Sequence, residues 1–195
     1  MSASPFSELV LASTSPARRA LMQSLRVPFR PEAPEVVEDF PPGTHVGDAV
    51  AMLAERKARA VFERNPSALV VGCDQLAALD GAALGKPSDR AAAREQLMRL
   101  SGRTHQIVTG LCLLGSGVRE LEVDVAHLTA FPLEPDEIER YVDLGEWEGC
   151  AGGYRVEAAG QALFREIAGD RAAVMGLPMV RLVNALRRLG WRFFE

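Results

Sequence analysis

The sequence contains almost no lysine. Of its 22 Lys and Arg residues, only Lys57 and Lys86 are lysines. An ammonium is a compact point charge and a guanidinium is a wide planar fork, so a chain this rich in arginine can keep lysine where the fork does not fit. The alternative is that both are ordinary surface residues, and each lysine has to be judged in its own context.

Cysteine and long apolar runs are also scarce. The three cysteines, Cys73, Cys112 and Cys150, are too far apart for a C-x-x-C motif, and their odd number argues against a disulfide framework. No apolar run approaches the roughly 20 residues of a membrane span, and the N-terminal segment lacks the pattern of a signal peptide. We therefore expect a cytoplasmic protein with reduced thiols and no membrane contact.

The overall charge excludes a further class of protein. A formal net charge of -4 over 195 residues is mild, so a nucleic-acid binder would need a local basic patch, and we expect no nucleic-acid partner. The common P-loop, dinucleotide, zincin and serine-hydrolase motifs are absent. With 48% hydrophobic residues, the chain can form one globular domain, or one core split into two lobes.

The apolar pattern predicts a mixed α/β fold, because short apolar runs alternate with segments of helical spacing. The expected strands cover residues 9–12, 69–72 continuing at 76–79, 82–84, 106–114, 118–131 and 161–167, and residues 27–31 are expected to be extended. The expected helices cover residues 16–25, 46–64, 88–100, 134–144 and 177–189, the third of them capped by Ser88. The proline-rich segment 31–43 is expected to be a loop.

Hydroxyl residues join the first strand to the first helix in segment 13–16, which reads STSP. A helix N-terminus presents unpaired N–H groups at the positive end of its dipole, where phosphate binds well. Arg18 and Arg19 add two guanidiniums in the first turn, where cations oppose the dipole unless an anion lies nearby. An ordinary serine cap with two solvated arginines is the alternative, and spacing alone does not choose between them.

An acid stands inside the apolar stretch LVVGCDQL, at Asp74. In α/β folds a carboxylate at such a position often lines the ligand crevice, where it can take up a proton or bind a divalent cation. Lys86 in a Gly-Lys-Pro turn and Glu38 in the proline-rich loop are further candidates. The alternatives are an acid that closes an ion pair, a surface lysine and a solvated loop acid.

Seven short motifs occur in a recognisable order. They are ASTSPARR at 12–19, AERKA at 54–58, GCDQ at 72–75, GKP at 85–87, SG at 101–102, CAGGYRVEAAG at 150–160 and GLP at 176–178. In this order they resemble Maf proteins, which are nucleoside triphosphate pyrophosphatases, over nearly the whole chain. The DQ pair and the Glu of CAGGYRVE resemble the 7-methyl-GTP branch, whereas the dTTP/UTP branch typically has DT and a Gln there.

The resemblance implies a Maf/ITPase-like mixed sheet with flanking helices, forming one domain over residues 1–195 with two lobes around a central cleft. It also implies a homodimer and divalent cations, Mg²⁺ or Mn²⁺, for hydrolysis of a nucleotide to its monophosphate and pyrophosphate. By motif position Asp74 is implied as the catalytic residue, and Glu38 and Asp74 as metal ligands. The resemblance assigns phosphate binding to Arg18, Arg19, Lys57 and Lys86. The helix N-terminus adds Ser13 and Ser15 to the expected phosphate site.

Base selection is implied for Ala17, Gln75 and Glu157. 7-Methylguanine carries a positive charge that guanine lacks, so Glu157 can offset that charge while accepting from the N1–H and N2–H₂ edge. Gln75 can donate and accept on the same edge. Ala17 stands where a tryptophan is expected in this branch, which removes a stacking platform for a cationic base, and Val37 precedes Glu38 where an acid is common.

Two alternative functions stay open. One is pyrophosphohydrolysis of dTTP, UTP or another modified nucleotide. The other is a non-catalytic nucleotide-binding regulator of septum formation, since Maf proteins are also associated with that process. The presence of Asp74 together with both lysines favours an enzyme, because a binding protein does not need a base aimed at the α-phosphate.

Overall fold

The computed structural model describes residues 6–194, so residues 1–5 and 195 of the predicted domain lie outside the described part. The strands are β1 (Leu9–Leu11), β2 (Arg30–Pro31), β3 (Leu69–Leu79), β4 (Ala82–Leu84), β5 (Thr104–Gly115), β6 (Val118–Ala130) and β7 (Phe164–Ala168). The α-helices are α1 (Pro16–Ser24), α2 (Val46–Arg64), α3 (Arg90–Leu100), α4 (Pro135–Val142), α5 (Arg171–Val174) and α6 (Met179–Arg188). Two short 3₁₀ helices are η1 (Ala151–Gly153) and η2 (Ala159–Leu163).

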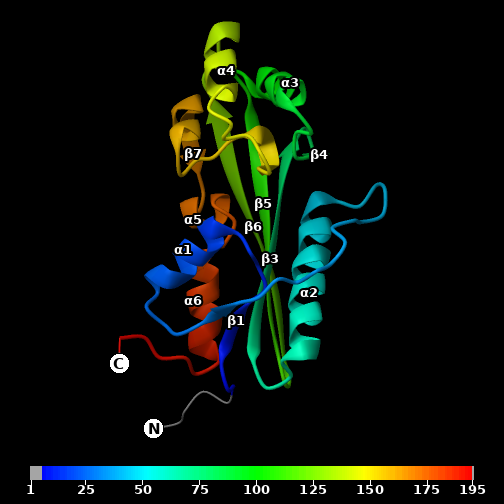
Figure 1. The fold of residues 1–195 in the computed structure, drawn as a ribbon, viewed down its shortest axis with the longest axis vertical. Helices are drawn as coiled ribbons and strands as arrows, with labels where there is room; N and C mark the ends of the chain where they lie inside the picture. The colour runs from blue at the N-terminus through cyan, green and yellow to red at the C-terminus, as the bar shows by residue number, and fades with distance from the viewer. Residues whose placement is uncertain (1–5, 195) are drawn as a thin grey trace.

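One mixed sheet of seven strands organises the described chain, in the order β2-β1-β3-β5-β6-β7, with β4 paired to β3. Strand β1 is parallel to β2 and β3, and the other neighbours are antiparallel. Figure 1 shows α1 and α6 on one side of the long strands, α2 on the other, and α3 and α4 at one end. The predicted α/β fold with flanking helices is confirmed.

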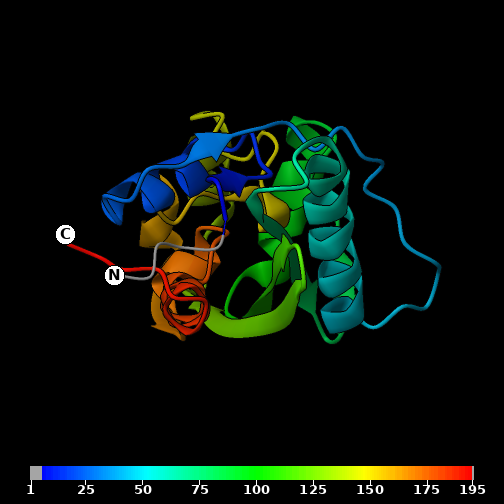
Figure 2. The same cartoon turned by 90° about the horizontal axis from the view of Figure 1, so that it is seen from below.

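Successive residues of β3 pack against different helices, because side chains alternate across a strand. Val70 packs with α2 residues in one buried cluster, whereas Val71 and Cys73 belong to the cluster that includes residues of α1 and α6. Figure 2 shows α2 and α6 on opposite sides of the sheet. The same alternation sends Asp74 toward α2 and Gln75 toward α5.

Two glycines let α2 lie directly on the sheet. A methyl group on Gly72 of β3 would come within 2.3 Å of the Ala54 carbonyl oxygen, and one on Gly110 of β5 within 2.3 Å of the Val50 carbonyl oxygen. Real side chains do not tolerate such distances, so glycine is required for this close packing. As a result Lys57, one turn after Ala54, reaches the strand that carries Asp74.

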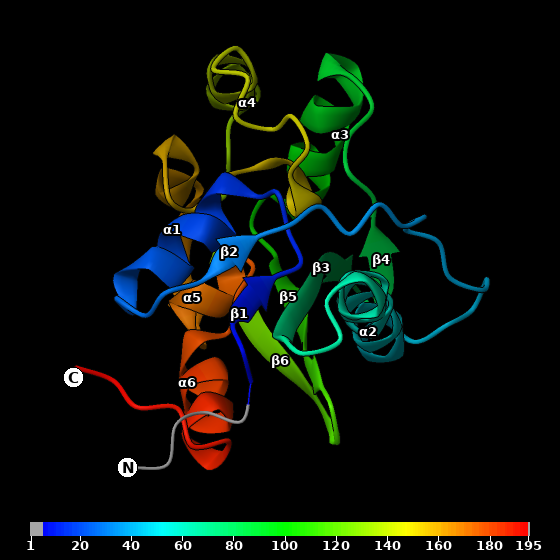
Figure 3. The same cartoon turned by 60° about the horizontal axis from the view of Figure 1, so that its bottom comes forward.

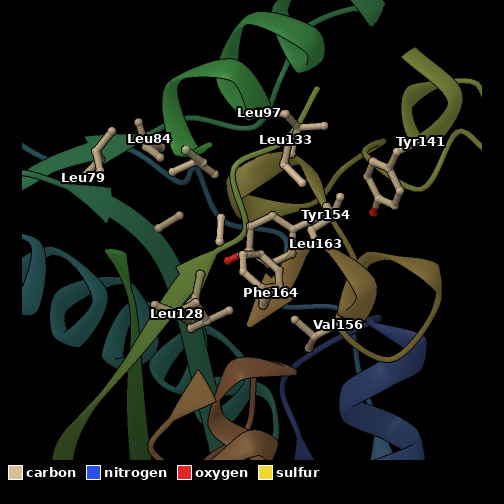
Figure 4. Packing of buried hydrophobic residues seen from close by; sticks show 14 of the residues in the cluster. Leu79, Leu84, Leu97, Leu128, Leu133, Tyr141, Tyr154, Val156, Leu163 and Phe164 are labelled. Carbon is tan, nitrogen blue, oxygen red and sulfur yellow. The ribbon is translucent and has the colours of Figure 1, made fainter. Parts of the chain in front are cut away.

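The end of the sheet beneath α3 and α4 has its own core. Figure 4 shows Leu128, Tyr154, Leu163 and Phe164 packed together there. The predicted strand at 161–167 is wrong in its first half, where η2 stands and β7 begins only at Phe164. The physical reason is that the Glu146 carboxylate accepts hydrogen bonds from the N–H groups of residues 159 and 160 and holds this segment in a turn.

Two smaller features differ from the sequence-based expectation. Asp89, and not Ser88, caps α3, because its carboxylate accepts a 2.8 Å hydrogen bond from the Ala92 N–H. The short helix α5 was not predicted, since four residues are too few to establish helical periodicity. Among residues 6–194, no helix combines the length and apolar character needed to cross a membrane.

Candidate active site

A cavity of about 330 Å³ lies at the edge of β3, beyond the end of β1. Strand β1 pairs with β3 only as far as Val71, and β4 begins its pairing at Ala77. The intervening residues of β3 therefore present an open edge, which the cavity occupies. Its volume falls within the range of sites for small molecules.

The cavity collects most of the predicted site residues. Those that line it are Ser13, Ser15, Ala17, Arg18, Glu38, Lys57, Asp74, Gln75, Lys86 and Glu157. Arg19 is exposed and does not line the cavity. Consecutive side chains on an α-helix point about 100° apart, so the orientation that brings Arg18 to the cavity turns Arg19 away from it.

Lys57 and Asp74 form a buried ion pair at the cavity wall. Their residues are only 4% and 5% exposed, and Lys57 Nζ donates a hydrogen bond to Asp74 Oδ1. The same Nζ lies 2.6 Å from Glu38 Oε1. Lys57 thus stands between two carboxylates, and removing it would leave Asp74 as a buried charge without its partner.

Glu38 and Lys86 extend this pair into a series of alternating charges. Lys86 Nζ lies 3.5 Å from Glu38 Oε2, and both side chains are largely exposed. Partial burial acts to raise the pKa of Glu38, but the hydrogen bond and charge of Lys57, together with the charge of Lys86, outweigh it and lower the pKa below its ordinary value. The two carboxylates of this series, Glu38 and Asp74, are therefore matched by two lysines.

The loop that carries Glu38 is fastened to α2. Figure 3 shows the segment between β2 and α2 crossing from one side of the sheet to the other. Arg56 Nη1 donates to the Val37 carbonyl oxygen and to Asp39 Oδ1, each at 2.6 Å. Val37, which stands where an acid is expected, therefore contributes its backbone to the loop while its side chain is exposed.

The donor set is suited to a divalent cation shared with a substrate. Glu38 Oε1 and Asp74 Oδ1 converge on Lys57 Nζ, so the two oxygens lie close to each other. Mg²⁺ is commonly held by one or two carboxylates, with phosphate oxygens and water as its other ligands. Residues 6–194 contain no group of three or more His, Cys, Asp or Glu residues that could hold a metal ion. Glu38 and Asp74 are the two residues here that could hold one together with a substrate and water.

The start of α1 forms another wall. The Ser15 hydroxyl accepts a hydrogen bond of 3.4 Å from the Arg18 N–H, and the Ser13 hydroxyl accepts one of 3.2 Å from the Ser15 N–H. Arg18 Nε donates to the Gly176 carbonyl oxygen at 2.8 Å, and Gly176 has a φ of +103° that favours glycine. One nitrogen of the guanidinium is thereby anchored, and the side chain is fixed at the cavity wall.

Gln75 is held by residues of α5, on the face of β3 opposite to the one that carries Asp74. Its Nε2 donates to the carbonyl oxygens of Ala173 and Val174, at 2.8 and 2.9 Å. Thr109 Oγ1 lies 3.2 Å from the same nitrogen. The sequence alone left Gln75 able both to donate and to accept, but in the structure its amide hydrogens are occupied and only Oε1 remains available to a ligand.

Alternation also orients the segment that carries Glu157. All four residues 154–157 line the cavity, and they alternate in burial: Tyr154 and Val156 are buried in the core shown in Figure 4, while Arg155 and Glu157 are exposed. Arg155 was not predicted as a site residue. The alternation of apolar and charged residues in this motif is the sequence signal that could have identified it.

A buried histidine fastens this segment to the sheet. His105 Nε2 of β5 lies 2.5 Å from the Tyr154 hydroxyl oxygen. Burial lowers the pKa of His105 to about 4, so the imidazole is neutral at pH 7. The Tyr141 hydroxyl accepts a 3.1 Å hydrogen bond from the Arg155 N–H and supports the same segment from α4. Neutral groups thus hold the wall of the cavity that carries Glu157.

A family model for Maf-like proteins matches residues 8–189 of this chain. The chain belongs to the Maf family. It is 42% identical to a dTTP/UTP pyrophosphatase of Symbiobacterium thermophilum, over 96% of each chain. It is also 42% identical to a 7-methyl-GTP pyrophosphatase of Pseudomonas syringae pv. tomato, over 93% of this chain and 96% of the relative.

Pyrophosphatases named for either substrate are therefore equally similar in sequence to this Maf protein. A 7-methyl-GTP pyrophosphatase of Xanthomonas oryzae is 43% identical, over 94% of this chain and 97% of the relative. Among solved structures, the Staphylococcus aureus Ham1 protein is similar with a TM-score of 0.43 and 18% identity, over 64% of this chain and 71% of that one, which is too distant to bear on function. Overall identity therefore does not choose the nucleotide.

Proposed function

We propose that this Maf protein hydrolyses 7-methyl-GTP to 7-methyl-GMP and pyrophosphate, and thereby removes a modified nucleotide from the cell. The observation that carries the proposal is the buried Asp74 carboxylate in a cavity that Lys57, Lys86 and Arg18 also line. An acid beside several cations is suited to a reaction at a phosphate, because the cations hold the anionic substrate while the acid acts on water.

In the proposed reaction, Lys86, Arg18 and the N-terminus of α1 bind the triphosphate. A water oxygen forms a bond to the α-phosphorus, the bond from that phosphorus to the bridging oxygen of the β-phosphate breaks, and pyrophosphate leaves. Asp74 accepts the proton of the attacking water. A bound Mg²⁺ or Mn²⁺ would neutralise phosphate charge, and Glu38 and Asp74 are the residues that would hold it.

The choice of base rests on two acceptors. Glu157 lines the cavity and is exposed, and Gln75 offers its Oε1. A positively charged 7-methylguanine is favoured by the negative charge of Glu157, whereas a uracil would turn carbonyl oxygens toward it. Ala17 provides no aromatic face, so recognition depends on hydrogen bonds and charge.

Hydrolysis of dTTP or UTP is the second candidate, because a relative that is 42% identical is named a dTTP/UTP pyrophosphatase and is as similar to this chain as the 7-methyl-GTP pyrophosphatases are. The test is to incubate the protein with Mg²⁺ or Mn²⁺ and a panel of nucleotides, and to measure pyrophosphate release. We expect 7-methyl-GTP to be hydrolysed with the highest kcat/KM. Faster hydrolysis of UTP would replace the first candidate by the second, and no hydrolysis of any nucleotide would favour the non-catalytic septum regulator.

Two substitutions test the assigned roles. Asp74→Asn should abolish turnover while nucleotide binding, measured by calorimetry, is largely retained. Glu157→Gln should lower kcat/KM for 7-methyl-GTP more than for UTP, while Glu148→Gln, which changes an exposed acid that does not line the cavity, should leave both unchanged. Equal losses on both substrates would contradict base reading by Glu157.

The cytoplasmic location, the homodimer and the absence of a nucleic-acid partner stay predictions. Gel filtration with light scattering tests the oligomeric state. A filter-binding experiment with duplex and single-stranded DNA and RNA tests whether the protein binds nucleic acid, and no binding at physiological salt is the expected result.

A further inference from the structure

The side-chain amide of Gln75 lies among hydrogen-bond acceptors. The carbonyl oxygens of Ala173 and Val174 approach its nitrogen at 2.8 and 2.9 Å, and Thr109 Oγ1 approaches at 3.2 Å. Amide orientation in proteins has to be inferred from such neighbours. Here a reversed amide would turn its oxygen toward two carbonyl oxygens, which repel it, so only the orientation with Nε2 toward α5 is stable.

Thr109 has a second contact that fixes its own role. Its hydroxyl donates to the Ala173 carbonyl oxygen at 2.9 Å, so its single hydrogen is used and it can only accept from Gln75. Because the two amide hydrogens of Gln75 face three acceptors, Thr109 Oγ1, the most distant at 3.2 Å, shares one of these hydrogens with a carbonyl oxygen of α5. Thr109 is fully buried and stands directly opposite Gln75 in the pairing of β5 with β3. The hydroxyl therefore ties the amide and the end of α5 to the same point of the sheet.

The turn after α5 links this arrangement to the phosphate side of the cavity. The Ala173 carbonyl oxygen also accepts from the Gly176 N–H at 2.9 Å, and the Gly176 carbonyl oxygen accepts from Arg18 Nε. One short turn thus holds both Gln75 and Arg18. The end of the site that faces the base and the wall that carries Arg18 are fixed relative to each other.

From these contacts we propose that Thr109 is a positioning residue which, with the carbonyl oxygens at the end of α5, fixes Gln75 as a pure hydrogen-bond acceptor toward the substrate base. The inference rests on the proposed function and makes it more specific. Gln75 Oε1 and the Glu157 carboxylate together present acceptors only, so they select a base edge with adjacent N–H donors. Guanine offers N1–H and N2–H₂ on one edge, whereas uracil and thymine offer one N–H between two carbonyl oxygens.

The test compares two nucleotides that differ by one donor group. 7-Methyl-ITP lacks the exocyclic amino group of 7-methyl-GTP and is otherwise the same. We expect the wild-type protein to favour 7-methyl-GTP by about tenfold or more in kcat/KM, since one hydrogen bond to a charged group is lost with the inosine nucleotide. Thr109→Val, which keeps the side-chain shape but removes the hydroxyl, leaves Glu157 unchanged and loosens only Gln75, so it should weaken the part of this preference that depends on Gln75 Oε1 and lower it about threefold, mainly through KM.

A matched variant separates positioning from packing. Thr109→Ser retains the hydroxyl and should keep the wild-type preference for the guanine nucleotide. If Thr109→Val lowers kcat/KM equally for both nucleotides, the residue only supports the fold and the inference is overturned. The same conclusion follows if Thr109→Ser loses the preference as completely as Thr109→Val.

A second measurement does not depend on turnover. In ¹⁵N-labelled protein, the side-chain amide protons of Gln75 should exchange with solvent more slowly than those of the exposed Gln23. Thr109→Val should accelerate exchange at Gln75 only. If the wild-type protein hydrolyses neither purine nucleotide, the proposed function fails, while faster exchange at Gln75 in Thr109→Val than in the wild type still supports the orientation by Thr109, and unchanged exchange refutes it.

Discussion

Asp74 and Gln75 are adjacent in β3, yet they belong to two differently built halves of the site. On the α2 side, Asp74 is held by the charge of Lys57, which also pairs with Glu38. On the α5 side, Gln75 is held by neutral groups, namely a threonine hydroxyl and two backbone carbonyls. Both side chains reach one cavity because the edge of β3 is open between β1 and β4.

The difference matters for both stability and function. Buried charges depend on each other, because removing one leaves its partner without compensation. Hydrogen bonds between neutral groups can be lost one at a time at lower cost. The charged half is suited to phosphate and metal chemistry, and the neutral half is suited to holding a fixed pattern of acceptors for a base.

Removing the Lys57 ammonium, which pairs with both Asp74 and Glu38, should have the largest effect on stability. Lys57→Met leaves Asp74 buried without its partner, so we expect the free energy of unfolding, measured by urea denaturation, to fall by about 3–5 kcal/mol. Adding Asp74→Leu to this variant should recover most of that loss but no catalytic activity. By comparison Gln75→Leu should lose only about 1–2 kcal/mol, and equal losses at Lys57 and Gln75 would remove the distinction between the two halves.

The close packing of α2 provides the next test of the charged half. Gly72→Ala places a methyl group against the Ala54 carbonyl oxygen, so α2 has to move, and we expect a loss of about 1–3 kcal/mol in stability. The movement also separates Lys57 from Asp74 and should lower kcat. Gly85→Ala is the control, since nothing lies within 4 Å of the added methyl group, and its stability should change by less than about 1 kcal/mol.

Acid should weaken the segment that carries Glu157, because His105 fastens it to the sheet through Tyr154. The pKa of His105 is lowered by burial from 6.5 to about 4, so the unfolded chain binds a proton between these values while the folded chain does not. This contribution is complete above pH 6.5 and is lost as the pH falls toward 4. Between pH 7 and pH 5 the wild-type protein should lose about 2 kcal/mol more than His105→Gln in urea denaturation, and parallel pH profiles would contradict this.

The smallest expected effect compares two neighbouring arginines. Arg18 lines the cavity and Arg19 does not, so Arg18→Ala should lower kcat/KM for 7-methyl-GTP about tenfold or more. Arg19→Ala should change it by no more than about twofold, as for a surface residue. Steady-state kinetics of the two variants measure this directly. Equal losses would mean that Arg19 also binds substrate.

Much of this site could be predicted along the chain, because its residues lie in short motifs at the ends of regular elements. Asp74 was recognisable as an acid in an apolar strand, and Lys57 and Lys86 as the only lysines. Thr109 could not be found in this way. It becomes important only because β5 pairs with β3 in a register that sets it opposite Gln75, and register depends on the whole sheet.

The sequence by itself determined most of the helices and strands, the family and most residue types of the site, since these depend on local periodicity and on motif order. Only the tertiary structure decided which arginine faces the cavity, which end of the Gln75 amide is free, and that Asp74 and Gln75 are held from opposite sides. Those properties depend on contacts between segments far apart in the chain, such as Gln75 with Ala173, and no local pattern encodes them. The tertiary structure therefore turns an ordered set of motifs into a charged half and a neutral half.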